Sequence, residues 1–242
     1  MPDLLSTGLS GLLAFRRALD TTGHNIANAN TEGYNRQRVE LVALEPSPFG
    51  NGYVGNGVRV ATVQRSYDAF LVSQARVSSS TLARLETFAT QAERLNNLFS
   101  DADNGLSVSL QKFHDALQSV ASTPGSLAAR QVLLGEMRAV ADRLRYFDAR
   151  LRDVDADIDG RLAIEIASIG SLAENIARLN GQISRGIAAT NQPPKDLLDQ
   201  RDRLIDQLSA KLNVQVVPQD AGTVNIFVGR GQALVLGTTA NR

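Results

Sequence analysis

The sequence predicts a mainly α-helical fold. We expect a long, coiled-coil-like helical bundle with an amphipathic helix at the N-terminus, a β-hairpin at about 35–63 and short strands near the C-terminal end. Three observations predict it. Apolar residues recur at helical spacing over most of the chain, residues 137–158 follow a strict heptad, and polar–apolar alternation is confined to short stretches. Aromatic residues make up only 5% and Trp is absent, so the core must be built from aliphatic side chains.

Composition excludes several classes of protein. The 242 residues carry 25 basic and 25 acidic side chains. The chain therefore lacks the net positive charge that would favour nucleic-acid binding. There is no Cys, which excludes disulfides and thiolate metal sites. No apolar run reaches the roughly 18 residues that a membrane span requires. Arg16 and Arg17 interrupt the first apolar stretch, which argues against a cleavable signal peptide.

Residues 5–26 are predicted to form an amphipathic helix, because their apolar positions recur in steps of three and four. Gly8, Gly11 and Gly23 each weaken an isolated helix by about 1 kcal/mol, so this helix needs a partner. The next 40 residues offer only a turn and polar extended chain, so we expect the partner elsewhere. The apolar stripe is therefore predicted to be an assembly interface, formed by Leu5, Leu9, Leu12, Phe15, Leu19 and Ile26.

A turn motif follows the helix. Asparagine and glycine residues at 28–33 favour the turn and left-handed conformations that end helices. The motif comprises Asn25, Asn28, Thr31, Gly33, Tyr34, Arg36 and Gln37. Alternating residues on both sides of a Pro- and Gly-rich loop then predict a long β-hairpin at about 35–63 with a flexible tip at 46–52.

Three helices are expected next. Ser66 is expected to cap the first, which runs to about residue 99 and stops at a break over 101–105. The second covers about 106–121. Thr123 and Pro124 are then predicted to restart the chain as a third helix that extends to about residue 187.

This third helix carries the heptad. Its seam consists of Met137, Val140, Leu144, Phe147, Leu151, Val154 and Ile158. Such a repeat is typical of a coiled coil. Some 60 helical residues would span roughly 90 Å. Glycines at 160, 170, 181 and 186 predict a kink or a break in the second half.

The C-terminal part reads as a turn at 191–194, an amphipathic helix from 196 to about 212, and strands at 214–217, 223–228 and 233–236. The Asp and Arg residues of the helix are expected to form surface ion pairs at i, i+3 and i+4. No closing element precedes Arg242, which we interpret as truncation inside a domain.

No catalytic grouping, cofactor or metal site is indicated. Residues 153–160 imitate a calcium loop, but Ile166 stands where the bidentate Glu is required, and the segment is needed for the heptad. An acidic helix face is the simpler interpretation; a secreted, calcium-responsive helical binding protein remains the alternative of another class. His24 and His114 lie in no metal-spaced cluster and are expected to be surface or capping residues.

Two stretches carry a family resemblance. The N-terminal Leu4-Leu5-Ser6-Thr7-Gly8-Leu9-Ser10-Gly11-Leu12 together with the turn motif resembles the signature of bacterial flagellar axial proteins, namely the rod, hook and hook-associated proteins. Tyr34-Asn35-Arg36-Gln37 and the segment DLLDQRDRLIDQL at 196–208 resemble the hook-associated members at the hook–filament junction. A hook or rod subunit is the alternative within the family.

The resemblance implies a secreted, non-enzymatic structural subunit of the extracellular flagellum. It implies type III export and assembly with copies of itself, the hook protein and the second hook-associated protein. A chaperone would bind a C-terminal region that this chain lacks. Residues 1–65 would be the N-terminal half of an inner-tube domain with a connecting hairpin, 66–190 a long-helix rod domain, and 191–242 its truncated helix and β segment.

Overall fold

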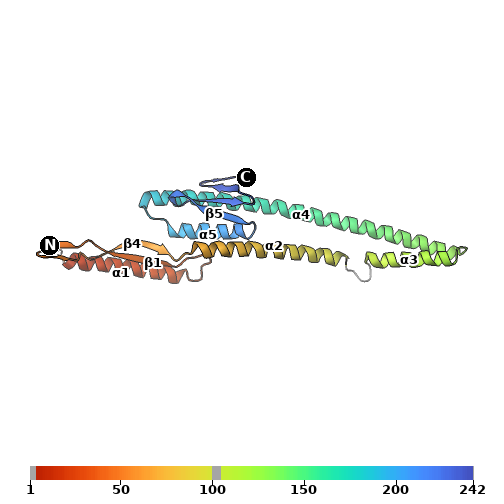
Figure 1. Cartoon of the computed structure of the whole chain (residues 1–242), viewed down its shortest axis with the longest axis horizontal. Coiled ribbons are helices and arrows are strands. Elements are labelled where there is room, and N and C mark those ends of the chain that lie inside the picture. The colour runs from red at the N-terminus through yellow and green to blue at the C-terminus, as the bar shows by residue number, and fades with distance from the viewer. Residues whose placement is uncertain (1–3, 100–104, 242) are drawn as a thin grey trace. The chain divides into compact units, whose positions relative to one another are not determined.

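The computed structural model describes residues 4–99 and 105–241 and confirms a mainly α-helical chain with two small β regions (Figure 1). The helices are α1 (Leu4–Ala27), α2 (Ala69–Phe99), α3 (Leu106–Ser122), α4 (Leu127–Thr190) and α5 (Lys195–Ser209). Two compact units divide the chain, Met1–Thr81 with Ile169–Arg242 and Leu82–Ser168. The expected break at 101–105 lies outside the described residues, except for Gly105.

The predicted hairpin is present. Strands β1 (Gln37–Ala43) and β4 (Val58–Arg65) pair antiparallel from Gln37↔Arg65 to Ala43↔Val58, with an irregularity in register after Glu40. The tip forms a second small hairpin from β2 (Ser47–Phe49) and β3 (Gly52–Val54), and its flexibility stays a prediction. Gly50 has φ +61°, and this conformation at the first position of a two-residue loop suits a tight hairpin turn.

Helix α1 has a local partner that the sequence analysis did not foresee. It lies along the β1–β4 hairpin (Figure 1). Small and short polar residues recur every three or four positions on the covered side, and each is buried or half-buried: Thr7, Ser10, Ala14, Ala18, Thr21, Asn25 and Asn28. Val58 N donates to Ser10 Oγ at 3.1 Å. The expectation of no local partner is therefore wrong for this side of the helix.

Helix boundaries differ from the prediction at two caps. Asp68, rather than Ser66, caps α2, because its Oδ1 accepts from the backbone N–H groups of Phe70 and Leu71 at 2.9 and 3.1 Å. Ser126, rather than Thr123, caps α4, since its Oγ accepts from Ala129 N at 3.2 Å. Thr123 instead follows α3 as its C-cap.

Helix α4 runs without interruption through all its glycines, so the predicted break is wrong. In the unit Leu82–Ser168, Phe147 is 4% exposed and stacks on Phe99 of α2 with ring centroids 5.2 Å apart. Arg94 of α2 pairs with Asp157 of α4 at 2.9 Å.

The hydrophobic core of the other unit lies between the end of α4, α5 and a four-stranded antiparallel sheet. Its strands are β5 (Val214–Pro218), β6 (Val224–Val228), β7 (Gln232–Leu236) and β8 (Thr239–Ala240), in sequence order. The three predicted strands are confirmed and β8 was missed; the helix before them ends at Ser209, about three residues early. The buried cluster comprises Ala173, Ile176, Ala177, Ile205, Leu208, Val214, Val224, Ile226 and Val235.

Candidate functional site

The turn motif after α1 is held by its own asparagines. Asn25 Nδ2 donates to Gln37 O at 2.8 Å, and Gln37 N donates back to Asn25 Oδ1 at 2.8 Å. The Tyr34 hydroxyl donates to the same Oδ1 and lies 3.0 Å from His24 Nδ1. Asn25 therefore joins the end of the helix to the start of β1, which explains an asparagine at this position.

Other motif residues shape the turn itself. Asn28 Nδ2 donates to His24 O at 3.0 Å, and Thr31 Oγ1 donates to Asn28 Oδ1 at 3.2 Å. Gly33 has φ +72°, a conformation that side chains other than Gly and Asn rarely adopt. A Cβ at Gly33 would also collide with the Arg203 side chain of α5. Arg36 is exposed.

The turn contacts α5 directly. Asn35 donates to Asp199 through its backbone N at 3.3 Å and through Nδ2 at 2.8 Å. Gln37 Nε2 donates to Asp196 Oδ1 at 3.3 Å. The two sequence motifs that suggested a hook-associated protein, at 34–37 and 196–208, therefore bind each other.

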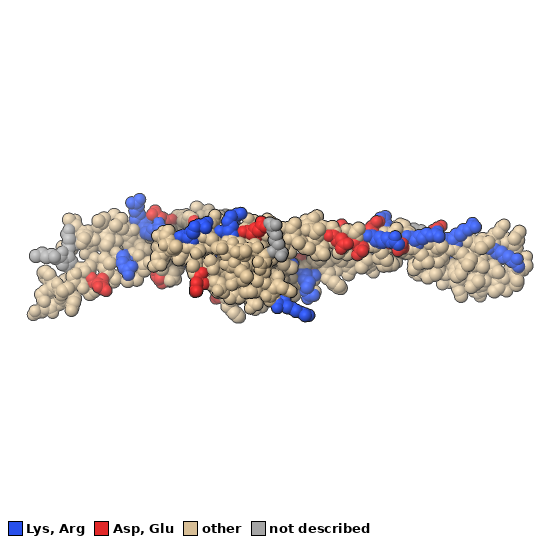
Figure 2. All heavy atoms as spheres, turned by 90° about the horizontal axis from the view of Figure 1, so that it is seen from above, with Lys and Arg blue, Asp and Glu red and all other residues tan. Residues whose placement is uncertain are grey.

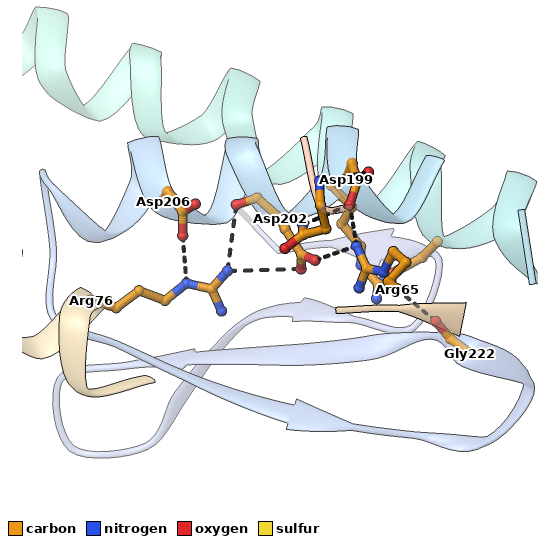
Figure 3. A network of polar contacts seen from close by, with 9 residues as sticks. Arg65, Arg76, Asp199, Asp202, Asp206 and Gly222 are labelled. Carbon is orange, nitrogen blue, oxygen red and sulfur yellow. Dashed lines mark hydrogen bonds and ion pairs between the residues drawn. The ribbon is translucent and has the colours of Figure 1, made fainter. Parts of the chain in front are cut away.

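Aspartates on α5 also bind two arginines from earlier in the chain (Figure 3). Arg65 Nη1 lies 2.5 Å from Asp199 Oδ1 and 2.9 Å from Asp202 Oδ2. Arg76 Nε donates to Asp206 Oδ1 at 2.6 Å, and Arg76 Nη2 lies 3.8 Å from Asp202 Oδ1. Apart from Asp206, whose side chain is 53% exposed, the side chains of this cluster are at most 11% exposed. We call these five residues the Arg–Asp cluster.

This finding corrects the prediction of surface ion pairs within α5. Asp199 and Asp202 are 4% and 8% exposed as residues, and their partners come from β4 and α2 rather than from the same helix. Spacing alone could not reveal this, because i, i+3 and i+4 charges look the same on an exposed face and on a face that binds another segment. Arg65 and Arg76 carried no signal in the sequence.

The opposite side of the α5 interface contains a second polar group. Arg201, 6% exposed, donates through Nη1 to Asn180 Oδ1 at 3.0 Å and to Gly222 O at 2.6 Å. Asn180 is fully buried and donates through Nδ2 to Val224 O and Gly237 O at 2.8 and 2.6 Å. Burial lowers the pKa of Arg201. These bonds join α4, α5 and the sheet. The prediction of a surface ion pair is therefore wrong for Arg201, and Asn180 was not predicted from the sequence.

Burial and neighbouring charge also shift groups beside the Arg–Asp cluster. Burial, reinforced by the charge of Asp202, raises the pKa of Tyr67, whose ring lies under the Arg65 guanidinium at 4.8 Å. Burial lowers the pKa of Lys195, and the positive charge of Arg65 lowers it further. Burial is thus the largest cause of both shifts, and the charges of the cluster contribute the rest.

The predicted stripe on α1 lies on the side away from the hairpin. Every one of its six residues is exposed, from 55% for Leu9 to 79% for Leu5. The hairpin covers the small residues and leaves the large ones open to solvent. That this stripe is an assembly interface stays a prediction.

The predicted heptad seam of α4 is unevenly covered. Phe147 is buried, Val140 and Val154 are half-buried, and the rest are 42–50% exposed: Met137, Leu144, Leu151 and Ile158. Its role as the seam of a rod likewise stays a prediction.

The acidic segment 153–160 is helical throughout. Residues two positions apart do not face each other on a helix, so Asp155, Asp157 and Asp159 do not converge on one point. Asp157 binds Arg94 and Arg161 instead. Over 4–99 and 105–241, no group of three or more His, Asp or Glu side chains is arranged to hold a metal ion. Both histidines are exposed.

Charge is mixed on the face of the molecule that Figure 2 shows, where Lys and Arg side chains are interspersed with Asp and Glu. Of the helices in the described part of the chain, none combines the length and the apolar character that crossing a bilayer would need.

Comparison with known proteins identifies the family. The sequence model described as flagellar hook-associated protein FlgK helical domain matches residues 92–242, more than half of the chain. The chain belongs to the FlgK family of flagellar hook-associated proteins. A second model, flagella basal body rod protein, matches residues 5–35, which contain the α1 stripe and most of the turn motif.

Individual relatives agree with this FlgK assignment. The chain is 39% identical to flagellar hook-associated protein 1 of Salmonella typhimurium over 244 residues and 36% identical to that of Escherichia coli. It is 32% identical to the Bacillus subtilis protein over 90% of the chain. The chain spans 44% of the length of each of these relatives.

A solved structure has the same fold. The flagellar hook junction protein FlgK from Burkholderia pseudomallei is 27% identical, with a TM-score of 0.64 over 69% of this chain and 29% of that one. The resemblance to the hook-associated branch of the axial proteins is thus confirmed for this FlgK-family chain.

Proposed function

We propose that this chain is the N-terminal part of a non-enzymatic structural subunit that joins the flagellar hook to the filament. The observation that carries the proposal is the match of the FlgK helical-domain model over 92–242. The exposed α1 stripe supports it, because large apolar side chains left in solvent along a whole helix usually mark a surface that another protein covers.

Each part of the chain has a role in this proposal. Residues 1–65 supply the inner-tube segment and its hairpin, 66–190 the long helices of the rod, and 191–242 the α5 helix and sheet. The α1 stripe contacts neighbouring axial subunits, and the partly exposed α4 seam contributes lateral contacts. Partners are copies of the same protein, the hook protein and the second hook-associated protein. An export chaperone would bind the whole protein outside this region.

The protein would work outside the cell, in the flagellum, after type III export. A hook or rod subunit is the second candidate, and the rod-protein match over 5–35 favours it. That match covers only the segment that axial proteins share, whereas the FlgK model covers the helical domain. Locating the labelled protein at the hook tip or at the hook base separates the two candidates.

Changing the α1 stripe tests the proposal. In the flagellar protein that contains this chain, Leu12→Asp places a charge on an interface that must become dry, whereas Leu12→Met keeps it apolar. We expect Leu12→Asp to abolish filament attachment and swimming, with secretion and the folding of 66–212 intact. Leu12→Met should swim normally. Normal swimming of cells that carry Leu12→Asp would refute the proposed interface.

A further inference from the structure

The tripeptide Gly-Asn-Gly occurs twice in the tip of the hairpin, as Gly50-Asn51-Gly52 and as Gly55-Asn56-Gly57. An asparagine followed by glycine is prone to lose its side-chain amide, because glycine has no side chain to hinder attack by its backbone nitrogen on the preceding amide carbon. The residues on either side of the asparagine are the same at both sites. A difference in reactivity between Asn51 and Asn56 in the folded chain is therefore set by the fold.

Asn51 lies in the two-residue loop between β2 and β3, next to the pair Phe49↔Gly52. Asn51 and Gly52 are both exposed. Among the residues that the structure describes, none forms a hydrogen bond or an ion pair with the Asn51 side chain. Strands β2 and β3 make a sheet of their own with only three residue pairs. A two-stranded hairpin is marginally stable at best, so this loop can open at little cost in free energy.

Asn56 is half-buried, and its amide is held. Its Nδ2 donates to Glu45 O at 2.5 Å and to Ser47 Oγ at 2.6 Å. The residue that would attack, Gly57, lies so close to α1 that a Cβ added to it would collide with Ser10 Oγ. Both hydrogen bonds must break before the Asn56 amide carbon can turn toward the Gly57 nitrogen, and that nitrogen belongs to backbone packed on a helix.

A third pair, Asn180-Gly181, lies within α4. Asn180 is fully buried, and its amide is bonded to Arg201 and to the sheet as described above. The backbone of Gly181 is fixed in the helix, so this pair is a second protected reference. A fourth pair begins at Asn104, which lies outside the described residues.

We propose that Asn51 is a site of spontaneous deamidation in the folded chain and that Asn56 and Asn180 are protected. Gly52 N bonds to Asn51 Cγ, the Cγ–Nδ2 bond breaks, and ammonia leaves with the proton of the Gly52 amide. Water then opens the succinimide ring at either carbonyl group, which gives aspartate or isoaspartate. Solvent water is the only co-reactant.

Deamidation changes both the charge and the backbone of the tip. Residues 46–58 contain no Asp, Glu, Lys or Arg, so the new carboxylate is the only charged side chain in this stretch. Aspartate keeps the length of the backbone, whereas isoaspartate adds one carbon atom to a two-residue loop and disrupts the pair Phe49↔Gly52. Old and newly made copies of the chain therefore differ at this tip. The inference goes beyond the proposed function and does not depend on it.

Incubation of the intact chain at mildly alkaline pH tests the proposal. Peptide mass spectrometry with fragmentation assigns the acid to one asparagine, and an isoaspartyl methyltransferase detects the isoaspartate. We expect Asn51 to react at least about tenfold faster than Asn56, because two hydrogen bonds hold the Asn56 amide. Asn180 should stay intact over the same period. In urea the rates at Asn51 and Asn56 should become similar.

Two variants separate the effects of the neighbour and of the fold. Gly52→Ala has open space for its Cβ and should slow the reaction at Asn51 without changing Asn56. Ser47→Ala removes one hydrogen bond from the Asn56 amide and should speed the reaction at Asn56 only.

Equal rates at Asn51 and Asn56 in the folded chain would overturn the proposal, and so would an Asn51 that reacts only in urea. Rates that still differ in urea would also overturn it, because the contrast would then arise from the sequence and not from the fold. An unchanged rate at Asn56 in Ser47→Ala would contradict the protection by hydrogen bonds. If Ser47→Ala does not fold, the parent chain in buffer and in urea decides.

Discussion

Asn180 offers a sharp test of how the α4–α5–sheet core is held. Its side chain is fully buried, and both donors and both acceptor positions of the amide are used. Asn180→Leu keeps a similar size but strands Val224 O, Val224 N and Gly237 O. Each stranded buried group costs about 1–3 kcal/mol, or about 3–9 kcal/mol for the three. The buried Leu returns only about 1.5–3 kcal/mol.

Taking the middle of each range, about 6 kcal/mol lost and about 2 kcal/mol regained, we expect Asn180→Leu to destabilise this unit by about 4 kcal/mol, a large part of the ~5–15 kcal/mol that a domain has in total. Urea dependence of hydrogen exchange in residues 224–228 reports this unit specifically. Asn213→Leu, at an exposed position before β5, is the matched control and should leave the midpoint nearly unchanged. Equal midpoints for the two variants would mean that the stranded groups find water, and the reasoning would be wrong.

Two further perturbations test local geometry and charge. Gly222→Ala should lower the free energy of unfolding by about 2–4 kcal/mol, because φ is +71° and the added Cβ would lie 2.5 Å from Ile187 Cδ1. Gly231→Ala, at φ +103° with open space around it, is the control that carries only the cost of the backbone conformation. Equal losses of stability for the two variants in thermal melts would contradict a steric clash at Gly222. The raised pKa of Tyr67 means that the folded chain holds its phenol proton more tightly than the unfolded chain does, so this stabilisation is complete below pH 10 and is lost as pH rises through the folded pKa. Tyr67→Phe should remove one phenol from the alkaline absorbance titration and reduce the loss of stability at alkaline pH. An unchanged dependence of stability on pH would contradict a contribution from the Tyr67 phenol.

Periodicity predicted the elements well, because long regular helices leave a strong signal. The start of α1 and the end of α2 both followed from the sequence. The capping residues were predicted less accurately. Ser66 and Asp68 are both good N-cap residues, and only the path of the chain selects Asp68. The break predicted in α4 is wrong because each glycine destabilises a helix by only about 1 kcal/mol, and packing of the helix can offset that cost.

The site was predicted only in part. The turn motif and the 196–208 helix were recognised as stretches, yet their contact with each other depends on tertiary structure. Arg65 lies 134 residues from Asp199 along the chain, so no local pattern joins them. The small residues Ser10, Ala14 and Thr21 did carry a signal, a second helical stripe, but small side chains are weak indicators beside the large apolar ones on the other side.

Those small residues set the thickness of the layer formed by α1 and its hairpin. A leucine at Ala14, which is 2% exposed, would push the helix axis outward and drag the attached loop with it. Asn35 reaches α5 only from its present position, with hydrogen bonds of 2.8 and 3.3 Å. The small size of the Ala14 side chain is therefore one condition for the hydrogen bonds between the Asp199 carboxylate and Asn35, which follows some twenty residues later in the chain.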